Sequence, residues 1–219
     1  VLLENPDVKL LITDYNMPKM DGFELVRNQW RRYLQSLQEP GEYIPEDNIS
    51  STFFNVIAVN IEENGKRQPI PYVLPPGIRR EQNLNTQNVN AQQNEQSVSV
   101  QVCGLQDGDA RAIYKNLNLD IRQYKRMRMF IHAESLVGAD PINDGDVTAF
   151  IRIGSDFTQN YYEYEIPLLL TPYTFTDTAE IWKELNELNL NLDSLISLKL
   201  ERNSVTENLT NPYKIIDAK

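Results

Sequence analysis

Cysteine and histidine are almost absent from this 219-residue chain, which has one of each, Cys103 and His132. A single cysteine cannot form an internal disulfide or supply a cysteine-based zinc site. A single histidine excludes paired-histidine metal motifs, and a Ser-His-Asp triad would have to use His132. The sequence therefore disfavours most metal-dependent and hydrolytic enzymes, and we expect no cofactor.

Basic residues are also in deficit, because 21 Lys and Arg stand against 31 Asp and Glu, for a formal net charge of −10. Nucleic-acid binding needs a concentrated basic face, so we expect no nucleic-acid partner.

No run approaches the roughly 18–20 apolar residues of a membrane-spanning helix. The first residues lack the pattern of a signal peptide, and the absence of an initiator Met suggests a piece cut from a longer chain. We expect membrane contact only through a larger parent protein.

Alternation of apolar and polar side chains is the main pattern that is present. It predicts half-buried antiparallel strands. The alternating segments are 53–61, 98–102, 127–133, 147–153 and 162–168. Turn-forming sequences such as Asn64-Gly65 separate them. We therefore predict a mainly β fold, an antiparallel jelly-roll-like β-sandwich over residues 41–219. Near the end we expect a short helix around 181–188 and a return to period 2 over 190–200.

Residues 1–40 have a different pattern. A short apolar run, Val8 to Ile12, ends at Asp14 and is followed by a loop that contains Pro18. Apolar residues then recur at helical spacing between Phe23 and Leu37. We interpret residues 1–40 as a strand-loop-helix segment that precedes the sandwich.

The stretch Leu10-Leu-Ile-Thr-Asp14-Tyr-Asn-Met-Pro-Lys-Met-Asp21-Gly22 resembles the phosphoacceptor strand and loop of response-regulator receiver domains, and this resemblance covers residues 1–27. It implies that Asp14 is a phosphoacceptor and that Asp14 and the backbone carbonyl of Asn16 could bind Mg²⁺. The acidic pair and the lysine that receiver domains also need have no counterpart in this sequence. We therefore expect Asp14 to be chemically idle.

A second set of motifs runs in consistent order through residues 27–219. The motifs include Arg27-Asn-Gln-Trp-Arg-Arg-Tyr33, Tyr72-Val-Leu-Pro-Pro-Gly-Ile-Arg-Arg-Glu81, Gly108-Asp-Ala-Arg-Ala-Ile-Tyr-Lys115, Met129-Phe-Ile-His-Ala-Glu134, Phe150-Ile-Arg-Ile-Gly-Ser-Asp-Phe157 and Asn160-Tyr-Tyr-Glu-Tyr-Glu-Ile-Pro167. Together they resemble an internal segment of the SprA (also called Sov) family, the outer-membrane translocon of type IX secretion and gliding motility.

This second resemblance implies a soluble insertion of a very large transmembrane β-barrel protein, located at the outer membrane or cell surface. The implied role is non-enzymatic, that of a structural and interaction module. Its implied partners are other subunits of the translocon, and secreted cargo is a further possible partner. Which membrane face the module occupies stays open.

Charged side chains on the polar sides of two predicted strands are our candidates for partner binding. They are Glu163, Glu165, Arg126 and Arg128. Such charges suit water or a protein partner and would be costly against lipid. We place His132 on the same polar side as Arg126 and Arg128, as a surface or rim residue.

Two alternative functions stay open at this point. The first is a truncated phosphorelay receiver fused to a binding domain, with the change of pattern near Arg27 as the junction, natural or artificial. The second is a carbohydrate-binding β-sandwich in which exposed Tyr161 and Tyr173 stack on sugars. Alternating aromatic residues in a strand are more often core and cross-strand packing, which ranks the second alternative lower.

Overall fold

The structure is a computed structural model that describes residues 8–14 (backbone only), 30–37, 52–80, 95–105, 108–117, 120–139, 141–205 and 213. The strands are β1 Val8–Asp14, β2 Arg31–Arg32, β3 Phe53–Asn60, β4 Gln96–Cys103, β5 Ile113–Tyr114, β6 Arg126–Ser135, β7 Thr148–Gly154, β8 Tyr161–Pro167 and β9 Leu188–Asn191. The helices are α1 Ile61–Asn64, α2 Thr178–Ile181 and α3 Leu192–Val205, with the 3₁₀ helices η1 Ile121–Gln123 and η2 Glu184–Asn186.

The largest sheet has five strands in the order β3-β4-β1-β6-β9, and each neighbouring pair is antiparallel. β7 and β8 form a separate two-stranded antiparallel hairpin, and β2 pairs with β5. The prediction of a mainly β, antiparallel fold is confirmed, and each of the five alternating segments contains a strand. The jelly-roll arrangement stays a prediction.

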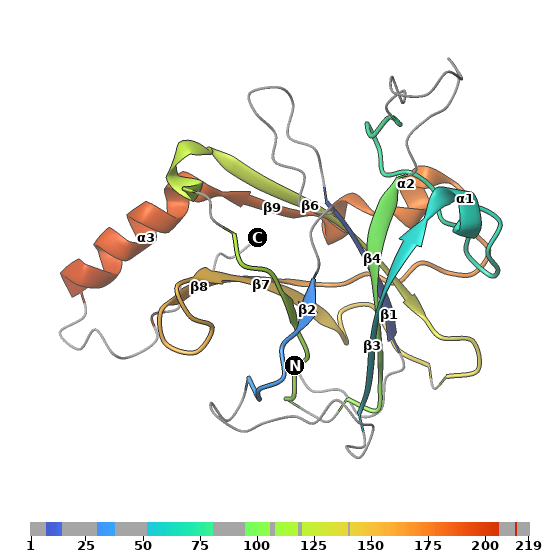
Figure 1. The fold of residues 1–219 in the computed structure, drawn as a ribbon, viewed down its shortest axis with the longest axis horizontal. Coiled ribbons are helices and arrows are strands. Elements are labelled where there is room, and N and C mark those ends of the chain that lie inside the picture. The colour runs from blue at the N-terminus through green and yellow to red at the C-terminus, as the bar shows by residue number, and fades with distance from the viewer. Residues whose placement is uncertain are drawn as a thin grey trace.

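Figure 1 shows β7 and β8 to one side of the five-stranded sheet and α1 and α2 to the other, near the upper ends of β3 and β4. On the hairpin side, Ile131 and Ala133 of β6 pack with Ile166 and Leu168. On the helical side, Phe130 of β6 packs with the residues Val59, Ile70, Tyr72, Ile181 and Trp182. Alternate side chains of β6 therefore enter two different apolar clusters, and neither face of its central part meets water.

The hairpin β7–β8 presents one face to the sheet and the other outward. Ile151 lies opposite Tyr164, and both pack against the hairpin-side cluster. The intervening pair, Arg152 and Glu163, lies on the outward face, where Arg152 Nε is 2.5 Å from Glu163 Oε2. The alternation of residues 147–153 and 162–168 therefore reflects an outer layer that is half buried.

β1 lies at the centre of the sheet, where Leu11 is opposite Ser99 of β4 on one side and His132 of β6 on the other. The first strand is thus joined by backbone pairing to strands from the 41–219 segment. The boundary near residue 40 stays a prediction about domain organisation.

Two local predictions are wrong. Most of the helix expected between Phe23 and Leu37 lies outside the described residues, but its last part is not helical, because Arg31–Arg32 form β2 and Tyr33 packs edge-on against Tyr114 and Phe157. The period-2 segment over 190–200 is mostly helix α3. Asn191 starts this helix, since its Oδ1 accepts a hydrogen bond from Asp193 N at 3.1 Å, as an N-cap does.

Candidate functional site

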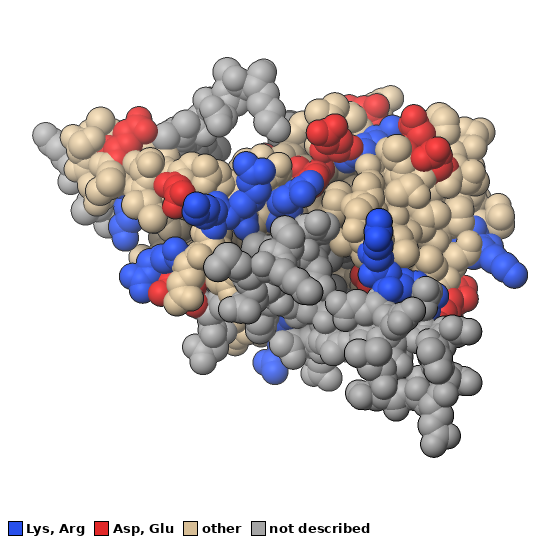
Figure 2. Space-filling model, turned by 90° about the horizontal axis from the view of Figure 1, so that it is seen from above, with Lys and Arg blue, Asp and Glu red and all other residues tan. Residues whose placement is uncertain are grey.

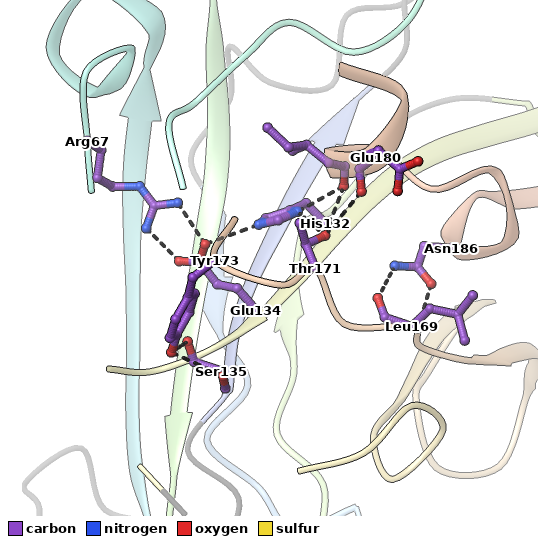
Figure 3. A network of polar contacts seen from close by, with 10 residues as sticks. Arg67, His132, Glu134, Ser135, Leu169, Thr171, Tyr173, Glu180 and Asn186 are labelled. Carbon is purple, nitrogen blue, oxygen red and sulfur yellow. Dashed lines mark hydrogen bonds and ion pairs between the residues drawn. The ribbon is translucent and has the colours of Figure 1, made fainter. Parts of the chain in front are cut away.

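A buried chain of polar side chains lies on the helical side of β6 (Figure 3). It runs from Arg67 through Glu134 and His132 to Thr171. His132 is 1% exposed, and Glu134 and Thr171 are 2% exposed. Buried polar groups of this kind must find partners within the protein, so each contact has a large energetic consequence.

Glu134 is held by a two-point contact with Arg67, from the segment that follows α1. Arg67 Nη1 donates to Glu134 Oε1 at 2.5 Å, and Arg67 Nη2 donates to Oε2 at 2.9 Å. The planar guanidinium matches a carboxylate in this geometry, which makes the ion pair both strong and directional. Arg67 therefore links the segment after α1 to the last part of β6.

His132 lies between two oxygen acceptors. Its Nε2 is 3.2 Å from Glu134 Oε2, and its Nδ1 is 2.9 Å from the backbone carbonyl oxygen of Ile181. A carbonyl oxygen only accepts, so Nδ1 carries a proton in this arrangement. The imidazole ring also packs edge-on against Trp182.

Thr171, His132 and Glu134 have the composition of a hydroxyl-imidazole-carboxylate triad. Thr171 Oγ1 lies 3.2 Å from His132 Nδ1 and donates to the Ile181 carbonyl oxygen at 3.4 Å. Since Nδ1 already donates to that carbonyl, it has no lone pair with which to take the Thr171 proton. The hydroxyl is also buried away from any substrate. The arrangement fits a structural network better than a nucleophilic centre.

The pKa of Glu134 is lowered from 4.5 to about 2. Burial is the largest influence and raises the pKa, but hydrogen bonds from His132 and Arg67, together with their charges, outweigh it. Glu134 is therefore ionised at neutral pH, which agrees with its role as an acceptor for both partners.

The expectation that His132 is a surface or rim residue is wrong. The alternation in sequence predicts that the side with Arg126, Arg128, His132 and Glu134 faces water. Instead α2 and Trp182 cover that side at His132, and Trp182 Nε1 donates to the Val73 carbonyl oxygen at 2.9 Å. The roles of Arg67 and Thr171 were missed, because both come from distant segments. The sequence feature that pointed to this network was the spacing of His132 and Glu134, which lie two residues apart in one strand.

The basic candidates lie at the first end of β6. Arg126 is exposed and is opposite Asn191 of β9. Arg128 forms an ion pair with Glu187, in which Arg128 Nη2 donates to Oε2 at 2.8 Å and Nε donates to Oε1. Its guanidinium also lies 5.8 Å from the Phe130 ring centroid. Arg128 is thus engaged within the chain.

The acidic candidates lie on the outward face of β8, where Glu163 and Glu165 are both exposed. Because Ile166 of β8 and Ile131 of β6 meet in the cluster between the two layers, this face and the Arg126 side of β6 point in opposite directions. The structure therefore does not bring the acidic and basic candidates into one patch. On the face seen in Figure 2, acidic and basic side chains are interspersed.

The two glycan candidates are engaged by neighbouring side chains. The Arg152 guanidinium lies 4.3 Å from the Tyr161 ring centroid and occupies that face of the ring. Tyr173 is exposed, and its hydroxyl donates to the Ser135 carbonyl oxygen at 2.8 Å. The two residues belong to different layers, and a flat aromatic platform formed by both is not seen.

Asp14 is the last residue of β1 and lies opposite Met129 of β6. Asn16, the second candidate magnesium ligand, lies outside the described residues. Phosphoacceptor sites of doubly wound folds form where the carboxyl ends of parallel strands meet. Both neighbours of β1 are antiparallel, so their carboxyl ends lie at the other edge of the sheet. Within the described part of the chain, no three His, Cys, Asp or Glu residues gather as a metal site.

We expect acetyl phosphate with Mg²⁺ to leave the mass of the chain unchanged. The reason is that the strands beside Asp14 run the wrong way to supply the acidic pair and the lysine that an acyl phosphate needs. Intact-protein mass spectrometry checks this, with Asp14→Asn as the control. Stoichiometric phosphorylation that is lost in Asp14→Asn would instead support the phosphorelay alternative.

None of the helices in the described ranges is long and apolar enough to cross a membrane. No curated protein matches the chain. A family model, SprA_N, described as motility related/secretion protein, matches residues 8–219. The match begins at β1 and covers both the stretch that resembles receiver domains and the change of pattern near Arg27. From the first strand of its sheet to its last residue, the chain belongs to the SprA_N family of motility related and secretion proteins.

Proposed function

We propose that this chain is a non-enzymatic structural and interaction module of an outer-membrane protein translocon, of the type IX secretion and gliding motility kind. The observation that carries the proposal is the family match over residues 8–219. The buried Arg67–Glu134–His132 network supports a structural role, because it joins segments distant in sequence around the sheet and leaves no accessible nucleophile.

The outward face of β8 is the surface that we assign to a partner subunit or to cargo. Glu163 and Glu165 are exposed there, and Arg152 and Phe150 lie opposite them on β7. Glu163 is already paired with Arg152, so Glu165 is the more informative position to change. Exposed charge mainly determines the rate and specificity of association, and this permits a test that leaves the fold intact.

Charge reversal by Glu165→Lys in the parent protein should weaken partner association or cargo secretion. The expected loss is about tenfold in affinity, since a like charge at an interface is strongly unfavourable. Co-purification of partner subunits and the amount of secreted cargo are the two measurements. Glu184→Lys is the matched control, because Glu184 is also exposed but lies on η2. Equal behaviour of the two variants would contradict the assignment of this face.

A further inference from the structure

The hairpin β7–β8 is a two-stranded sheet, so each strand has one edge without a ladder partner in the described part of the chain. The hydrogen-bonding pattern identifies which groups of β8 point to its open edge. Ser155 N donates to Asn160 O and Leu168 N donates to Val147 O, which marks both pairs as hydrogen-bonded pairs of the hairpin register. Since such pairs alternate in antiparallel ladders, the pairs 153/162, 151/164 and 149/166 are hydrogen-bonded too.

The remaining residues of β8 therefore direct their backbone groups away from β7. These residues are Tyr161, Glu163, Glu165 and Pro167. Pro167 fits this pattern, because a residue without an N–H is tolerated in a strand where its nitrogen faces the open edge. The outward N–H and C=O groups at the middle of β8 thus belong to Glu163 and Glu165, the two residues whose carboxylates are exposed.

These two carboxylates select what can pair with the edge. A second copy of β8 would bring Glu163 and Glu165 of one chain close to the same residues of the other, and like charges across a ladder are destabilising. Lysine or arginine at alternate positions of an added strand would instead face both carboxylates. Arg152 is the only basic residue in β7 and β8, and it lies opposite Glu163. The two carboxylates therefore leave this face with a net negative charge.

We infer that the open edge of β8 accepts an extended segment of a partner protein that carries basic residues at every second position. Backbone hydrogen bonds to Glu163 and Glu165 hold the added segment, and the two carboxylates favour basic side chains on it. This inference rests on the proposed function, because it uses the same face of β8, and it names the chemistry of the partner.

The test uses the 219-residue chain and the synthetic peptide acetyl-Thr-Val-Lys-Val-Lys-Val-Thr-amide. Two matched peptides serve as controls, one with glutamate in place of both lysines and one with N-methylated lysines, which keep their charge but lack those backbone donors. We expect a dissociation constant below about 1 mM for the first peptide and at least about tenfold weaker binding for both controls. Amide hydrogen exchange should slow at Glu163 and Glu165 when the first peptide binds.

Glu165→Lys should weaken binding of the first peptide by about tenfold or more, whereas Glu184→Lys should leave it unchanged. Equal binding of the N-methylated peptide, or no slowing of exchange in β8, would overturn strand addition. Absence of peptide binding together with a secretion defect in Glu165→Lys would overturn this inference and leave the proposed function standing. Peptide binding without any secretion defect would overturn the proposed function and leave this inference standing.

Discussion

Replacement of Glu134 by alanine should lower the free energy of unfolding by roughly 3–5 kcal/mol, as is usual when one partner of a buried ion pair is removed. Glu134 is 2% exposed and accepts hydrogen bonds from Arg67 and His132, so the substitution leaves two donors without their acceptor. Chemical denaturation at pH 7 measures the loss. Glu163→Ala is the matched control, since its ion pair with Arg152 lies at the surface and should contribute less than about 1 kcal/mol.

The contribution of Glu134 should also depend on pH. Its pKa is about 2 in the folded chain against 4.5 ordinarily, so the ionised carboxylate stabilises the fold above about pH 4.5. The stabilisation is lost as the pH falls from 4.5 toward 2. The stability difference between the native chain and Glu134→Gln should therefore shrink over this interval. A difference that stays constant from pH 6 to pH 2.5 would contradict the ionised network.

Replacement of Trp182 by alanine should cost about 3–5 kcal/mol, the usual range for a large buried aromatic side chain. Trp182 is 3% exposed, contacts Tyr72, Phe130 and His132, and donates its indole N–H to Val73. The substitution opens a cavity between the sheet and the layer that covers its helical side. Thermal or denaturant unfolding provides the measurement.

Phe175→Ala is the control for Trp182, because Phe175 is also aromatic and lies in the same chain segment but is 37% exposed. It should cost under about 1 kcal/mol. Similar small losses at both positions would mean that the helical side of the sheet is not a packed layer, and the burial of His132 would then also be wrong.

The strands could be predicted from the sequence because period-2 alternation persists wherever a strand has two different faces. Ile131, Ala133, Ile151 and Ile166 all alternate with larger or more polar residues, and all pack between the hairpin and the sheet. Alternation does not say what covers the more polar face. His132 and Glu134 therefore resembled surface residues, although their partners Arg67 and Thr171 arrive from elsewhere in the chain.

The last helix shows a different limit of sequence reasoning. Leu188 and Leu190 alternate with Asn189 and Asn191 in β9, and the leucines that follow extend the same visual pattern into α3. The change of structure occurs at Asn191, whose side chain caps the helix. An asparagine followed two residues later by an aspartate is a helix-start signal, and the run of leucines masked it.

The candidate partner surface could be named from sequence, but its geometry could not. The sequence predicts Glu163 and Glu165 as charges on the polar side of a strand, and in the structure both are exposed on β8. That their backbone groups also face an open edge depends on the register of β7 against β8, which no local pattern reveals.

The central claim, that this chain acts through an interaction surface and that its buried polar centre is structural, is tested most directly by comparing two variants in one secretion assay of the parent protein. Thr171→Val removes the hydroxyl beside His132 and keeps the side-chain shape, whereas Glu165→Lys reverses a charge on the outward face. The account predicts that folded Thr171→Val protein secretes cargo normally and that equally folded Glu165→Lys protein does not. Loss of secretion in stably folded Thr171→Val, with Glu165→Lys unimpaired, would contradict it.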